Sequence, residues 1–149
     1  MIWKPNVTVA SIVELDGKFL MVEEESANGP LINQPAGHLE PNEGMRDAVI
    51  RETLEETGYT FTPKAVIGSY LWHNEENETT YFRTTFLGTV CIKTIAEDLD
   101  KGIIRALWMS RDEIIANEHR LRSPIILESI DDYLSGKTYP LDLVKSYIK

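Results

Sequence analysis

Residues 37–59 read GHLEPNEGMRDAVIRETLEETGY and contain the clearest helical segment of the chain. From Met45 to Thr57 the residues are good helix formers, with no proline or glycine among them. Gly58 follows at the position where a left-handed residue commonly caps a helix. We therefore predict a helix from Met45 to Thr57.

Three glutamates lie near the C-terminal end of this predicted helix. At about 100° per residue, Glu52 and Glu56 are about 40° apart around the axis, and Glu55 lies on the same side. Carboxylates at this spacing repel and raise one another's pKa unless a positive charge lies among them. A divalent cation would supply that charge, although a solvated acidic face is the alternative. Oxygen ligands without cysteine or clustered histidine favour Mg²⁺ over Zn²⁺, with Mn²⁺ as a substitute.

The same stretch resembles the Nudix box, G-x5-E-x7-R-E-U-x-E-E-x-G-U, in which U is an apolar residue. The positions that match are Gly37, Glu43, Arg51, Glu52, Glu55, Glu56, Gly58 and Tyr59. So many positions at fixed spacing make the resemblance specific. It departs at Thr53, where an aliphatic residue is usual. We expect this departure to weaken packing without affecting a ligand.

The resemblance implies a role for each matching side chain. Glu52, Glu55 and Glu56 would bind Mg²⁺ directly or through water, together with the carbonyl of Gly37. Bound Mg²⁺ neutralises and positions diphosphate oxygens and lowers the pKa of an attacking water. An ion pair would fix the loop against the helix, as partners of metal ligands do. The catalytic residues implied are Glu43, Arg51, Glu52, Glu55 and Glu56.

The general base stays open between several carboxylates. Glu55 is the first choice, because a glutamate at the edge of a metal cluster can accept a proton from water. Many Nudix enzymes carry another acid shortly before the tryptophan of the last strand, but the position six residues before Trp108 is Gly102. The alternatives are Asp98, Asp100 and the loop residue Glu76.

Segments outside the box resemble the NudJ-type phosphatases of the Nudix superfamily. They include KP at 4–5, NQPAGHLE at 33–40 and LRSP at 121–124, whereas residues 62–100 are only loosely similar. The likeness implies a small-molecule substrate: a nucleoside di- or triphosphate, hydroxymethylpyrimidine pyrophosphate or thiamine pyrophosphate. The alternatives are an ADP-ribose or dinucleoside polyphosphate pyrophosphatase, and a Nudix-fold sensor that binds a nucleotide without turnover. Retention of every box glutamate favours catalysis.

Aromatic and basic residues outside the box are candidates for substrate contacts. Trp72 and Tyr70 can stack on a ring, and Arg83 is a cation within a β segment. Arg120 and Arg122 precede a predicted helix N-terminus, a suitable place for an anion. A core position for the aromatic residues and surface ion pairs for these two arginines are the alternatives. We take Trp72, Arg83 and Arg122 as the substrate-binding residues.

The remaining pattern predicts strands followed by short helices. The strands are expected at residues 8–14, 18–23, 65–71, 79–92 and 103–109, and the helices at 110–115 and from Ser123-Pro124 to Gly136. Residues 24–33 are expected to form a loop. This order indicates an α/β (α+β) fold with a mixed β-sheet covered by helices, and the resemblance implies the Nudix α/β/α sandwich. We expect one domain over residues 1–149.

Composition excludes several kinds of partner. The formal net charge of −9 argues against duplex DNA and anionic membranes. Residues 7–13 form an apolar run too short for a membrane span and unlike a signal-peptide core, so we expect a cytoplasmic protein.

The single cysteine, Cys91, excludes an internal disulfide and is expected in the core. We expect a monomer or a homodimer.

Overall fold

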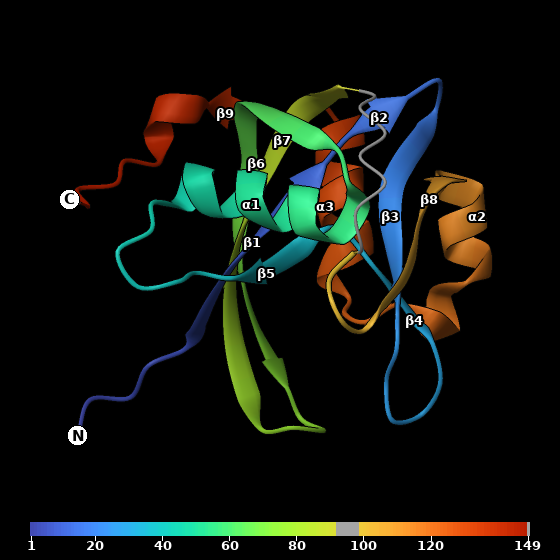
Figure 1. Cartoon of the computed structure of the whole chain (residues 1–149), viewed down its shortest axis with the longest axis horizontal. Coiled ribbons are helices and arrows are strands. Elements are labelled where there is room, and N and C mark those ends of the chain that lie inside the picture. The colour runs from blue at the N-terminus through green and yellow to red at the C-terminus, as the bar shows by residue number, and fades with distance from the viewer. Residues whose placement is uncertain (92–98, 149) are drawn as a thin grey trace.

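The strands form two sheets in the computed structural model, which describes residues 1–91 and 99–148 (Figure 1). The first sheet has the order β5-β1-β7-β6-β9, and it is mixed because β1 and β7 run parallel while the other neighbours are antiparallel. Its strands are β1 (Asn6–Ile12), β5 (Ala36–His38), β6 (Thr60–Asn74), β7 (Thr79–Cys91) and β9 (Tyr139–Pro140). In the second sheet β3 pairs antiparallel with each of the others. These strands are β2 (Glu14–Leu15), β3 (Lys18–Glu24), β4 (Leu31–Asn33) and β8 (Ile103–Ser110).

Helices cover both sides of the sheets and enclose two apolar cores. They are α1 (Met45–Thr57), α2 (Arg111–Ala116), α3 (Ile125–Leu134) and the 3-10 turns η1 (Glu118–Arg120) and η2 (Leu141–Leu143). Neighbouring strand residues point to opposite cores: Leu20 of β3 packs with α1, whereas Met21 packs with α2 and α3. Figure 1 shows α1 in front of the sheets and α3 behind them. The α/β/α sandwich expected from the sequence is confirmed, with two sheets rather than one.

Helix α1 has the bounds that the sequence predicts. Gly58 has a φ of 78° and donates its N–H to the carbonyl of Leu54, which ends the helix in the left-handed region that glycine adopts readily. Thr53 is fully buried, and its hydroxyl lies 2.9 Å from that of Ser11 on β1. The sheet therefore supplies a polar partner for the Thr53 hydroxyl, whereas the expected loss of packing relative to an aliphatic residue stays a prediction.

Several other elements differ from the sequence prediction. β4 lies inside the predicted loop, and β5 falls where no strand was predicted, since strands of three residues carry no readable periodicity. β6 is longer than predicted at both ends. Cys91 is exposed at the end of β7, which corrects its expected core position, and residue 92 lies outside the described residues. No helix in the described ranges is long and apolar enough to span a bilayer.

Candidate active site

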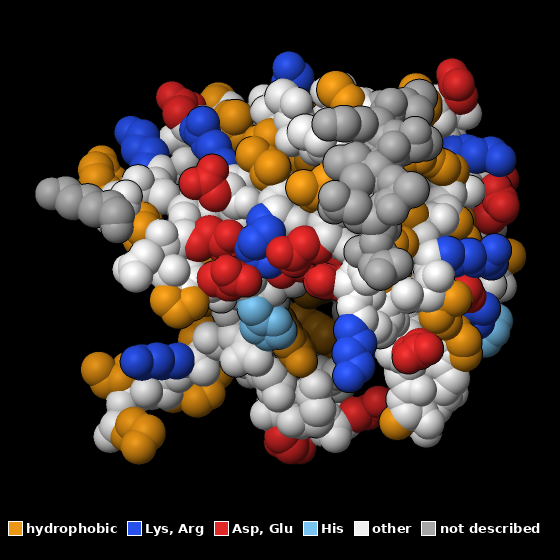
Figure 2. All heavy atoms as spheres, viewed as in Figure 1, with side chains coloured by type: hydrophobic (Ala, Val, Ile, Leu, Met, Phe, Trp, Pro, Cys, Tyr) orange, Lys and Arg blue, Asp and Glu red, His pale blue; other side chains and the backbone are white. Residues whose placement is uncertain are grey.

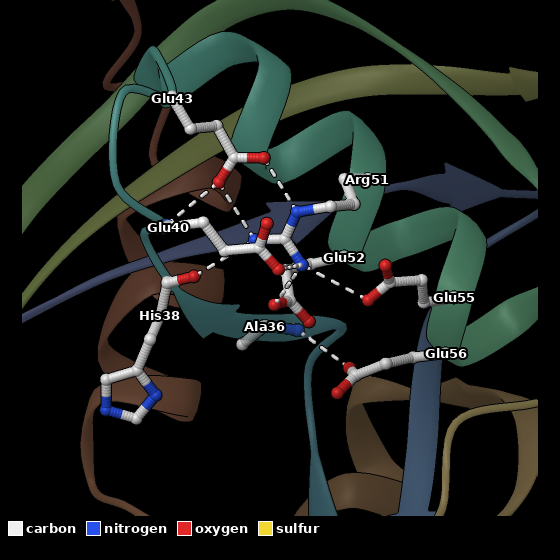
Figure 3. A network of polar contacts seen from close by, with 8 residues as sticks. All are labelled: Ala36, His38, Glu40, Glu43, Arg51, Glu52, Glu55 and Glu56. Carbon is white, nitrogen blue, oxygen red and sulfur yellow. Dashed lines mark hydrogen bonds and ion pairs between the residues drawn. The ribbon is translucent and has the colours of Figure 1, made fainter.

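A single guanidinium organises the acidic side chains of the box. Arg51 of α1 donates from Nε to Glu43 at 2.6 Å and from one terminal nitrogen to Glu52 at 2.8 Å and Glu55 at 3.1 Å. It also donates to the carbonyl of His38 at 3.1 Å. Figure 3 shows these carboxylates pointing toward Arg51, while the ring of His38 points away. The predicted ion pair between Glu43 and Arg51 is thus present, and it joins the loop to the helix.

The loop itself also orients Glu43. The backbone N–H of Glu40 donates to the Glu43 carboxylate at 3.0 Å, and the Glu40 carboxylate lies 3.5 Å from Arg51. The hydrogen bonds that Arg51 donates to Glu43 lower the pKa of Glu43 and raise the pKa of Arg51. Four carboxylates therefore contact one guanidinium, and the group stays net negative.

Glu52, Glu55 and Asp100 bring carboxylate oxygens within 4.8 Å of one another. Asp100 reaches this point because its backbone N–H donates to the carbonyl of Glu55 at 2.9 Å, near the helix end where carbonyls lack helical partners. Burial raises the pKa of Glu52, and burial followed by repulsion from Asp100 raises the pKa of Glu55. Oxygen ligands whose charges repel one another fit a hard divalent cation.

Glu56 lies on the same side of α1 but is oriented differently. Glu56 is 7% exposed, and its carboxylate accepts a 2.9 Å hydrogen bond from the backbone N–H of Ala36 (Figure 3). It is not among the residues whose oxygens cluster within 4.8 Å. Burial raises the pKa of Glu56 to about 9. A cation near this carboxylate would displace its proton, so metal affinity would rise with pH.

Strand β5 holds this cluster from the other side. A Cβ built on Gly37 would lie 2.1 Å from the carboxylate carbon of Glu52, so a side chain at position 37 would force the Glu52 carboxylate to move. β5 is positioned by its antiparallel pairing with β1, in which Gly37 lies opposite Val9. The carbonyl of Gly37, predicted as a ligand from the resemblance, thus belongs to a residue that contacts the cluster.

The stability of the metal-free protein is expected to depend on the ionisation of Glu56. Between the ordinary pKa of 4.5 and the folded value of about 9, the folded state keeps a proton that the unfolded state has lost. The contribution of Glu56 to the free energy of unfolding is fully present below pH 4.5, and it is lost as the pH rises from 4.5 to about 9. The slope is at most about 1.4 kcal/mol per pH unit. Denaturant unfolding in chelator at several pH values measures this, and equal slopes for wild type and Glu56→Gln would contradict it.

A cavity of about 230 Å³ lies beside β5 and shares Gly37 with the acidic cluster. Figure 2 shows acidic side chains gathered over α1, with a hollow directly below them. Trp72 and Tyr81, which are paired across β6 and β7, stack in the cavity wall with ring centroids 5.8 Å apart. Its lining includes Thr8, Glu24, Asn33, Gly37, His38, Trp72, Asn74, Asn77, Tyr81, Arg83, Arg122 and Ser123.

The three predicted substrate-binding residues all line this cavity. Arg83 is 9% exposed, and Trp72 is half-buried. Arg122 forms an ion pair with Glu24, the surface alternative that its position allowed. Tyr70 does not line this cavity, and its hydroxyl donates a 2.7 Å hydrogen bond to Asp132. Arg120 pairs with Glu23 at 2.6 Å.

The structure also distinguishes the alternative candidates for the general base by their distance from the cluster. Asp100 joins the cluster, whereas Glu76 is exposed in the turn between β6 and β7. Asp98 lies outside the described residues. Sequence reasoning missed Thr8, Tyr81 and Ser123, which line the cavity. For Thr8 and Tyr81 the signal is the register between β1 and β7, in which Thr8 lies opposite Arg83, and this register cannot be read from one strand alone.

A family model described as the NUDIX domain matches residues 3–129, and the chain belongs to the Nudix family. It is a Nudix hydrolase, 40% identical over 148 residues to Phosphatase NudJ of Escherichia coli (strain K12), with 97% of this chain and 94% of that protein covered. A solved NUDIX hydrolase from Nitrosomonas europaea is similar, with 48% identity, a TM-score of 0.94 and 97% and 98% of the two chains covered. The MutT protein from Methanosarcina mazei Go1 shares the fold, with 23% identity, a TM-score of 0.73 and coverage of 92% and 99%.

Proposed function

We propose that this Nudix hydrolase requires Mg²⁺ and cleaves phosphoanhydride bonds of nucleoside di- or triphosphates, or of hydroxymethylpyrimidine or thiamine pyrophosphate, with release of phosphate. The observation that carries the proposal is the cluster of Glu52, Glu55 and Asp100 oxygens within 4.8 Å, beside a cavity with an aromatic wall. The similarity to Phosphatase NudJ supports the release of phosphate.

The residues present fit a hard dication. Glu52, Glu55 and Glu56 from the box would hold Mg²⁺, with Asp100 as a further ligand and Mn²⁺ as a substitute. The raised pKa values of the three glutamates have burial as their largest cause, which a nearby cation would offset. When bound, Mg²⁺ neutralises phosphate oxygens and lowers the pKa of the attacking water.

The chain's own side chains orient these groups and move the proton. Arg51 holds Glu52 and Glu55 on one side of the helix through hydrogen bonds of 2.8 and 3.1 Å, while Glu43 fixes Arg51. Glu55 has a side chain 37% exposed at the edge of the cluster, which suits the general base that accepts the proton of the attacking water. Trp72 would stack on the substrate ring, and Arg122 would lie at the polar wall of the cavity.

A substrate panel tests the proposal. Purified protein is incubated with nucleoside di- and triphosphates, the two vitamin-type pyrophosphates, ADP-ribose and a dinucleoside polyphosphate, each with Mg²⁺, Mn²⁺ or chelator. We expect Mg²⁺-dependent phosphate release from the di- and triphosphates or the vitamin-type pyrophosphates, with products identified by ³¹P NMR. Turnover confined to ADP-ribose or the dinucleoside compound would replace the proposed substrate class. Saturable nucleotide binding without any turnover would indicate a sensor.

The proposed location and assembly come from the sequence. A cytoplasmic protein that acts as a monomer or homodimer, without nucleic acid or membrane partners, stays a prediction. Sedimentation of the purified protein would separate monomer from homodimer.

A further inference from the structure

Three buried polar side chains in the cavity have little or no hydrogen bonding within the described ranges. Thr8 is 4% exposed, Arg83 9% and Ser123 6%. The hydroxyls of Thr8 and Ser123 have no hydrogen-bond partner among residues 1–91 and 99–148. Arg83 has one long hydrogen bond, 3.5 Å from a terminal nitrogen to the side-chain oxygen of Gln34. All three line the same cavity.

The fold brings these side chains together from distant segments. Thr8 of β1 lies directly opposite Arg83 of β7, so both side chains project from the same face of the sheet. His38 of β5 lies opposite Thr8 on its other side. Ser123 comes from the segment just before α3 and closes the cavity from a second direction. The arrangement is therefore built by tertiary contacts rather than by one exposed loop.

A buried guanidinium without a close acceptor is costly for the folded state. Arginine has five N–H donors and no acceptor, and here one neutral amide at 3.5 Å meets only part of that capacity. Gln34 is itself held in place by a 2.9 Å hydrogen bond to Ser129, so it cannot easily approach. Burial lowers the pKa of Arg83 to about 10, which agrees with the loss of solvation.

The charges lining the cavity select the kind of ligand that would satisfy these donors. Glu24, the cavity's acidic side chain, is already paired with Arg122. Arg83 therefore leaves the described lining with one net positive charge, in a protein whose formal net charge is −9. A guanidinium and two hydroxyls that can donate match an anion with several acceptor oxygens.

We propose that Thr8, Arg83 and Ser123 form a phosphate-binding subsite separate from the carboxylate cluster of Glu52, Glu55 and Asp100. The bound group is either a phosphate carried by the substrate beyond the bond being cleaved or free orthophosphate. The first of these sources rests on the proposed function, whereas the second does not.

Calorimetric titration of orthophosphate into the protein in chelator tests the subsite. Without metal, the carboxylate cluster repels phosphate, so binding reports the cavity alone. We expect Arg83→Gln to weaken binding by at least about 10-fold and Ser123→Ala by about 3-fold or more. Arg111→Gln is the matched control, because Arg111 pairs with Asp131 at 2.7 Å and does not line the cavity. Ser123→Ala removes a hydroxyl without a protein partner in the described chain, so it should fold even if Arg83→Gln does not.

Steady-state kinetics then separate the two sources of phosphate. If the group belongs to the substrate, orthophosphate competes with substrate, and Ser123→Ala raises KM while leaving kcat nearly unchanged. If the site takes free orthophosphate, inhibition is not competitive, and the variant changes the inhibition constant without changing KM. Either pattern supports the subsite. It is overturned if wild type binds no orthophosphate in chelator, or if Ser123→Ala and Arg83→Gln bind it as wild type does. A protein that fails the substrate panel can still pass this titration.

Discussion

Replacing Glu56 by glutamine is expected to lower turnover by at least about 100-fold while the fold stays intact. In the wild type, the N–H of Ala36 donates a 2.9 Å hydrogen bond to Glu56. Glutamine keeps a side-chain oxygen that can accept this hydrogen bond. It removes the negative charge that the proposed Mg²⁺ site uses. The measurements are kcat at saturating Mg²⁺ and the thermal unfolding midpoint at the same pH.

Glu118→Gln is the control for this change. Glu118 is exposed in η1, away from α1 and the cavity lining, so the same substitution there should leave kcat unchanged. Unchanged turnover of Glu56→Gln would remove Glu56 from the proposed ligands and leave Glu52, Glu55 and Asp100. Loss of the folded state in that variant would instead show that the buried carboxyl group is needed for stability.

Replacing Gly37 by alanine is expected to reduce kcat by a similar factor, about 100-fold, and to raise the Mg²⁺ concentration needed for half activity. The added Cβ would lie 2.1 to 2.3 Å from the carboxylate atoms of Glu52. Because Gly37 is not among the residues with positive φ, its backbone tolerates alanine, and the clash falls on the Glu52 side chain. Glu52 must then rotate away from Glu55 and Asp100. Activity measured across a Mg²⁺ titration checks this.

Gly44→Ala is the matched control for the substitution at Gly37. Gly44 precedes α1 with a φ of −73°, and its added Cβ would meet Ser146 at 3.2 Å rather than a carboxylate of the cluster. We expect a small change in stability and near-normal Mg²⁺ dependence. If both variants behave alike, the close approach of β5 to Glu52 has no special role in the proposed metal site.

Arg51 contacts two of the proposed metal ligands. It lies between Glu52 and Glu55 and partly offsets the repulsion that the sequence predicts for them. One guanidinium contacted by four carboxylates leaves the group net negative, so its presence does not replace a divalent cation. We interpret Arg51 as holding the cluster in a binding geometry before the ion arrives.

Helix α1 and its acidic side were predictable from local sequence. Periodicity places Glu52, Glu55 and Glu56 on one side within two turns, and Gly58 ends the helix because of its own backbone freedom. Both effects act over a few residues, so no distant contact is needed to establish them. The pairing of Glu43 with Arg51 was implied by the resemblance to the Nudix box, and the structure shows it.

Contacts between distant segments decided the remaining features of the acidic cluster and the whole of the cavity beside it. The meeting of Asp100 with Glu52 and Glu55, and of Thr8 with Arg83 and Ser123, depends on how the strands and helices pack. The N–H of Ala36 reaches Glu56 only because β5 pairs with β1, and β5 is too short to be recognised by periodicity. Strand register and the burial of a charge are properties of the assembled sheets. A chain read one segment at a time shows the carboxylates that can bind a cation, but it does not show the cavity beside them.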